Sequence, residues 1–78
     1  MPTIIRKAGF SFKIYTNDHE PMHVHAFYQG NEVTINFTDE SVSIRENRGL
    51  NRIRVQRAMR VVFENRRLLI EKWREIYE

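Results

Sequence analysis

The stretch MHVHAFYQGNEVTINF, residues 22–37, decides the fold because its pattern is that of two strands joined by a turn. Apolar and polar residues alternate along 32–37, and a period of two is typical of a half-buried strand. Residues 22–28 predict the partner strand, and the Gln-Gly-Asn sequence at 29–31 favours a hairpin turn between them. The stretch therefore predicts an antiparallel hairpin.

Strand patterns continue on both sides of this hairpin. FSFKIY at 10–15 alternates in the same way, and the Asn, Asp and Pro that follow it favour a turn. SVSI at 41–44 predicts a short further strand after a turn at 38–40. Together these segments predict a small antiparallel sheet of three to four strands with short connections.

The second half of the chain predicts helix. Residues 51–77 contain no glycine or proline, and their apolar residues recur at spacings of three and four. Asn51 suits an N-cap, and Asn65 marks a break between helices at 52–64 and 66–77. One kinked continuous helix is the alternative.

The faces of these elements predict the architecture. A one-sided sheet and amphipathic helices can each cover the apolar face of the other. We therefore expect one α+β domain over 1–78, in the order ββββαα, with the helices packed on one face of the sheet.

Composition limits the classes of protein to consider. The chain is 41% hydrophobic and 29% charged, without cysteine, so no disulfide and no thiolate ligand is available. No apolar run approaches the roughly 20 residues that a membrane span requires, and no leader segment is visible. We expect a cytoplasmic protein without membrane contact. A chain of this size has a small core, which leaves stabilisation by a partner or a homodimer open.

Every histidine of the chain lies within seven residues, at His19, His23 and His25, beside Asp18. On a strand over 22–28, His23 and His25 point to one face, with the loop that carries His19 folded over them. Three roles stay open. The rings can be structural, they can bind a transition metal such as zinc although no cofactor is otherwise implied, or they can perform acid–base chemistry.

The catalytic alternative is cleavage of RNA without a metal. Two imidazoles near neutrality can act as base and acid, with Asp18 orienting one of them, and cations can stabilise the charged transition state. Lys13, Tyr15, Arg45 and Arg54 are the candidate helpers.

Residues 45–60, RENRGLNRIRVQRAMR, are strongly basic, with six arginines and one acid. Such a segment can meet RNA, DNA or an acidic partner protein, or it can be a solvated face that pairs with local glutamates. The candidate contacts are Arg45, Arg52, Arg54, Arg57 and Arg60.

A family resemblance rests on three stretches of this sequence. MPTI at the start, FSFKIYTNDHEPMHVHAFYQG and FENRRLLIEKWREI together resemble domain of unknown function family 4160, with the pattern D-H-x-P-x-H-V-H-A as the most specific part. The chain departs from the family in having a single Pro21 where members often carry two prolines, and in lacking a proline at the start of the first helix. The resemblance implies one component of a two-gene system of the toxin–antitoxin or mobile-element kind, and it supplies no catalytic residues.

Two functions follow as expectations. The first is a small interaction module that binds a small partner protein. The second is a histidine-dependent ribonuclease-like toxin or metal-binding enzyme that uses His19, His23 and His25.

Overall fold

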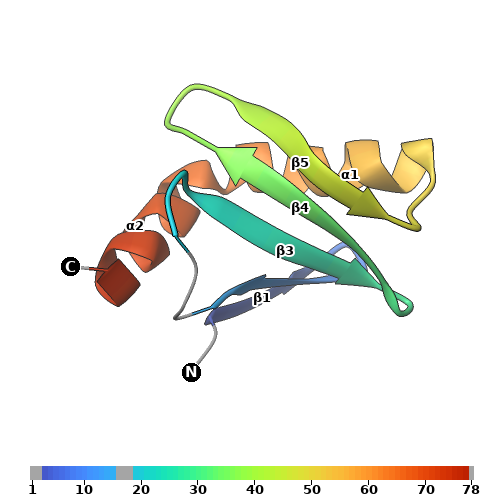
Figure 1. The fold of residues 1–78 in the computed structure, drawn as a ribbon, viewed down its shortest axis with the longest axis horizontal. Coiled ribbons are helices and arrows are strands. Elements are labelled where there is room, and N and C mark those ends of the chain that lie inside the picture. The colour runs from blue at the N-terminus through green and yellow to red at the C-terminus, as the bar shows by residue number, and fades with distance from the viewer. Residues whose placement is uncertain (1–2, 16–18, 78) are drawn as a thin grey trace.

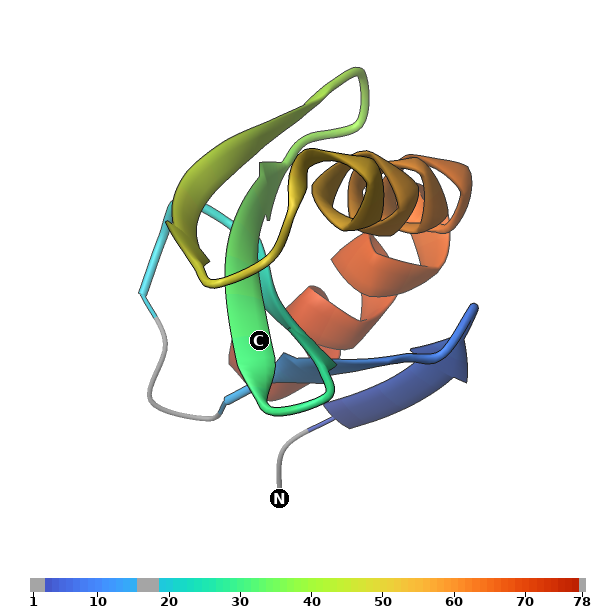
Figure 2. The same ribbon diagram turned by 90° about the vertical axis from the view of Figure 1, so that its right-hand side faces the viewer.

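The computed structural model describes residues 3–15 and 19–77, which form a sheet followed by two helices. In chain order the elements are β1 (Thr3–Lys7), β2 (Phe10–Ile14), β3 (His23–Tyr28), β4 (Asn31–Phe37), β5 (Val42–Arg48), α1 (Arg52–Glu64) and α2 (Arg66–Tyr77). Within the described residues, five strands make one antiparallel sheet in the order β1-β2-β3-β4-β5. Both helices lie on the same side of β3 and β4, as Figure 1 and Figure 2 show.

The α+β class and the order of sheet before helices are confirmed, but the sheet has one strand more than predicted. The extra strand is β1, whose sequence TIIRK places two apolar residues side by side instead of alternating them. Ala8 and Gly9 connect it to β2 with positive φ values of 54° and 81°. The fourth predicted strand also continues beyond residue 44 to Arg48, because backbone pairing with β4 extends to the Glu32–Arg48 pair.

A two-residue turn sets the register of the central hairpin. Gln29 and Gly30 both have positive φ, at 48° and 84°, which matches the twist of the type I′ turns that join antiparallel strands. The turn pairs Tyr28 with Asn31 and places His25 opposite Thr34. The face on which each histidine lies is therefore fixed by this turn.

The core lies between the sheet and the helices. The alternation predicted for β2 is present, since Phe10, Phe12 and Ile14 are buried while the residues between them are half-exposed. The other buried apolar residues are Val24, Ala26, Val33, Ile35, Phe37, Leu50, Val55, Ala58, Val62, Leu69, Ile70 and Trp73.

The two predicted helices are confirmed with their boundaries. Asn51 is the N-cap of α1, and its side-chain oxygen accepts a hydrogen bond of 2.9 Å from the backbone N–H of Arg54. Asn65 ends α1, and its side-chain amide donates to the carbonyl of Val61. Within the described part of the chain, neither helix has the length and apolarity needed to cross a bilayer.

Arg66 is a polar residue at the junction between the apolar stripes of the two helices. Its guanidinium donates to the carbonyl of Asp39 at 2.6 Å and to the carbonyl of Phe63 at 2.7 Å. It also lies 4.0 Å from the centroid of the Phe63 ring. Arg66 thus connects the β4–β5 turn to the junction between α1 and α2.

We predict that Ile35→Ala lowers the free energy of unfolding by about 2–5 kcal/mol, because truncating a fully buried side chain leaves a cavity. Ile53→Ala is the matched control, since the Ile53 side chain is 68% exposed. Its loss should change the free energy of unfolding by no more than about 0.5 kcal/mol. Urea denaturation followed by circular dichroism measures both, and equal losses would contradict the placement of Ile35 in the core.

Candidate functional site

His23 and His25 project from the same side of β3, as the alternation of the strand predicts. Val24 and Ala26 point to the opposite side and are fully buried in the core. The centroids of the two imidazole rings are 5.3 Å apart, and the rings meet edge to face. The two rings therefore form one site rather than two separate ones.

This site is more buried than an outer sheet face would be. His23 is only 5% exposed, and the side chain of His25 is 17% exposed. The reason is that α2 ends beside the start of β3 (Figure 1), which brings the Trp73 ring to 5.5 Å from the His23 ring.

Five rings from three parts of the chain form a cluster that we call the ring cluster: Tyr15, His25, His23, Trp73 and Tyr77. Along this series, consecutive centroids are separated by 4.9, 5.3, 5.5 and 4.5 Å. The Tyr77 hydroxyl then donates a hydrogen bond of 2.8 Å to the backbone carbonyl of Tyr15. The series closes on itself, so the histidines connect the end of α2 to the start of β3 and the end of β2.

The Nδ1 atom of His23 contacts two groups. It lies 2.8 Å from the carbonyl oxygen of Pro21 and 3.2 Å from Nη1 of Arg45. A carbonyl only accepts, so the shorter contact is a hydrogen bond when Nδ1 carries the proton. A guanidinium only donates, so in that tautomer Arg45 contacts the ring without a hydrogen bond to Nδ1.

His25 is oriented by a carboxylate on the neighbouring strand. Its Nδ1 lies 2.9 Å from Oε2 of Glu32, and the hydroxyl of Thr34 lies 3.4 Å from the same nitrogen. A carboxylate bonded to one ring nitrogen fixes the tautomer and the direction of the other, as in many general bases. Here the other nitrogen, Nε2, is buried.

Of the remaining members of the predicted histidine site, His19 is exposed and has no contact with this arrangement among the described residues. Asp18 lies outside the described residues. Over 3–15 and 19–77, no three histidine or carboxylate side chains are grouped so that they could hold a metal ion.

Two of the predicted helpers lie on different sides of the sheet. Lys13 is opposite His25 in the β2–β3 register, and its ammonium group lies 5.0 Å from the centroid of the Phe27 ring. The guanidinium of Arg54 instead lies 4.4 Å from the centroid of the Tyr28 ring, which packs against the core. Lys13 is therefore near the histidines and Arg54 is not.

The basic segment does not form one continuous cationic surface. Arg60 pairs with Glu64 at 3.4 Å along α1, and Arg48 bonds the carboxylate two residues before it on β5 at 3.0 Å. Arg52 and Arg57 are exposed on α1. The arginines of this segment are thus divided between the histidine site, the Tyr28 ring, local ion pairs and solvent.

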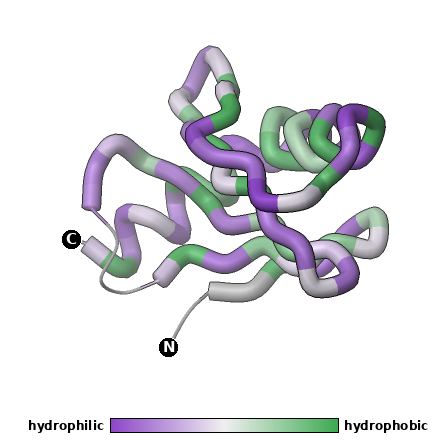
Figure 3. The backbone as a smooth tube through the Cα atoms, turned by 45° about the vertical axis from the view of Figure 1, so that its right-hand side comes forward, coloured by the Kyte–Doolittle hydropathy of each residue, from purple (hydrophilic) through white to green (hydrophobic). Residues whose placement is uncertain are grey.

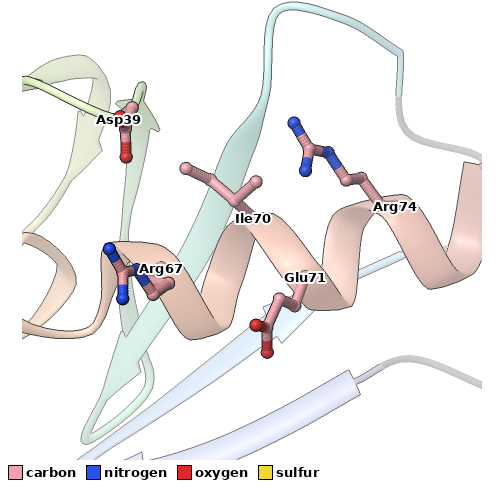
Figure 4. Close-up of a pocket in the computed structure, with 5 residues that line it drawn as sticks. All are labelled: Asp39, Arg67, Ile70, Glu71 and Arg74. Carbon is pink, nitrogen blue, oxygen red and sulfur yellow. The ribbon is translucent and has the colours of Figure 1, made fainter.

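Two surface hollows lie beside α2 and share Arg74. The first is lined by Asp39, Arg67, Ile70, Glu71 and Arg74, and Figure 4 shows Asp39 approaching α2 from the β4–β5 turn. The second is lined by Glu20, Met22, Trp73, Arg74 and Tyr77. Their charges are mixed and their linings contain no imidazole, so we do not assign chemistry to them.

Sequence reasoning did not identify Glu32, Trp73 and Tyr77 as part of the site. The two-residue turn could have revealed Glu32, because it fixes which residues of β3 and β4 share a face. The positions of Trp73 and Tyr77 depend on how α2 docks, which no local pattern specifies.

The chain matches the family model described as a domain of unknown function (DUF4160) over residues 9–74. The match includes the histidine pattern and most of both helices, so the chain belongs to this family and the resemblance is confirmed. No curated protein and no solved structure matches it.

We predict that His23→Ala lowers the free energy of unfolding by about 1–3 kcal/mol, because it removes the ring against Trp73 and the donor to the Pro21 carbonyl. His19→Ala is the matched control on an exposed histidine, and its effect should stay within about 0.5 kcal/mol. Urea denaturation measures both variants. A structural role for His23 is wrong if the two variants are equally stable.

Proposed function

We propose that the protein is a small cytoplasmic interaction module that binds a partner protein as one component of a two-gene, toxin–antitoxin-like system. The two-gene context comes from the family resemblance. The binding role rests mainly on one observation: His23 is buried inside the ring cluster and the His25 side chain is only 17% exposed.

The enclosed position of the two histidines limits the access of a substrate from solution. Their Nδ1 atoms contact Pro21 and Glu32, and their rings pack between Tyr15 and Trp73. Side chains in such surroundings hold elements together, as a scaffold requires. A catalytic pair would need at least one ring nitrogen within reach of a substrate.

The exposed surface supports binding instead. Several large apolar side chains are exposed, namely Ile44, Ile53, Phe63 and Leu68. Some arginines have no carboxylate within one turn of their own helix. Arg57 on α1 is one of them, and it adds positive charge to the surface of this small protein. Protein interfaces commonly combine apolar contacts with arginine.

Co-expression with the protein encoded by the neighbouring open reading frame tests this proposal. We expect the two chains to copurify through size-exclusion chromatography, and the growth of cells that express either chain alone to differ from growth with both. His25→Gln should retain copurification, because this substitution leaves the surface unchanged. Chains that elute separately at micromolar concentration would refute the proposal.

The His25–Glu32 hydrogen bond favours ribonuclease activity as a second candidate, which requires the ring cluster to open so that Nε2 of His25 becomes accessible to RNA. In this mechanism a ribose 2′-oxygen attacks the adjacent phosphorus while one imidazole takes the hydroxyl proton. The bond from phosphorus to the 5′-oxygen breaks as the second imidazole, protonated, donates its proton to that oxygen. A 2′,3′-cyclic phosphate and a free 5′-hydroxyl result. Arg45, whose Nη1 lies 3.2 Å from Nδ1 of His23, would stabilise the developing charge.

This second candidate predicts that purified protein cleaves RNA and that Glu32→Gln slows cleavage by about 10²-fold without unfolding the chain. Denaturing gel analysis of a labelled RNA measures the rate, and circular dichroism checks the fold. Intact RNA after incubation with wild-type protein would eliminate this candidate.

A further inference from the structure

β5 is an edge strand with an unused backbone edge. It is the last strand in the sheet order, and within the described residues no strand pairs with its outer side. A seven-residue edge presents a row of N–H and C=O groups that can accept another strand. Such an edge is either protected or used for binding.

The side chains of β5 contribute little to the core. Every residue from Ser43 to Arg48 is exposed, whereas most of its neighbour β4 is buried. Ile44 is 48% exposed although it lies opposite the fully buried Ile35. The strand is thus held mainly by backbone pairing with β4, and it offers an apolar side chain beside its free edge.

The charge of this edge favours an acidic partner. β5 carries Arg45 and Arg48 against Glu46, a net charge of +1. The Arg48 side chain is 68% exposed although it bonds to Glu46, so its guanidinium can also contact a carboxylate on a partner strand. Pairing of β5 with a second copy of itself would bring together two edges of net charge +1 each, whereas an acidic strand would neutralise this charge.

We propose that β5 is the docking edge for an extended, acidic segment of the partner protein, which adds to the sheet as a further strand. Backbone hydrogen bonds to β5 supply affinity, and carboxylates opposite Arg48 with an apolar residue beside Ile44 supply specificity. This inference rests on the proposed function, because it requires that a partner binds.

The opposite edge of the sheet provides an internal comparison. β1 is five residues long, and its Ile5 packs against the core.

The edge of β5 can also be interpreted as protected. The bulge between Thr34 and Ile35 interrupts the β4–β5 register, and bulges commonly protect edges from pairing. The two interpretations differ in what happens to the β5 amides when a partner binds.

Hydrogen–deuterium exchange distinguishes these two interpretations of β5. It is measured on the full chain, alone and in complex with the protein of the neighbouring open reading frame. We expect the amides of β5 to exchange at least about tenfold more slowly in the complex, with β1 unchanged. Slowed exchange in the helices or beside Arg74, with β5 unaffected, would overturn the β5 inference and leave the interaction module intact. Absence of any complex would overturn both.

Charge reversal tests the acidic nature of the partner segment. Arg48→Glu should weaken binding of the same partner by about tenfold, since it places like charges across the new strand pair. Arg6→Glu on β1 makes the same charge change at an exposed position on the opposite edge of the sheet and should alter affinity by less than about twofold. Isothermal titration calorimetry measures both, and equal losses would overturn the docking edge. If the β5 amides of the chain alone exchange more slowly as its concentration rises, β5 forms a homodimer. That result would also overturn the docking of an acidic partner segment.

Discussion

The structure depends on the docking of the end of α2 against the first residues of β3. Trp73 meets His23, and Tyr77 bonds the backbone at Tyr15, so a helix near one end of the chain is attached to strands from the first third of it. A domain this small has little apolar area with which to hold α2. Aromatic rings in tilted and edge-to-face contact that also make hydrogen bonds supply contact area and direction together.

This constraint changes how the histidine pattern is interpreted. Three histidines in one short stretch suggest chemistry, yet His23 is buried, His25 is only 17% exposed, and the two rings are oriented by Pro21 and Glu32. The same residue types that form a catalytic site can also form a junction between elements. Arg45 contacts the junction as well, so part of the basic segment is also structural.

Much of the fold could be predicted from the sequence, because its elements obey local rules. The alternation in β2 and β4, the Gln29–Gly30 turn and the break at Asn65 are each decided by a few adjacent residues. β1 was missed because edge strands need not alternate, although the Ala8–Gly9 turn was a signal for it. The site was predicted only in part, since burial of His23 depends on a helix fifty residues further along the chain.

The hydrogen bond between Tyr77 and Tyr15 spans 62 positions of the sequence, which has a consequence for biosynthesis. During translation the sheet can pair as its hairpins leave the ribosome, because each strand follows its neighbour directly. The His23 ring then stays open to water until α2 emerges and brings Trp73 against it. The nascent chain thus passes through a stage in which this imidazole is more exposed than in the folded protein, where it is 5% exposed.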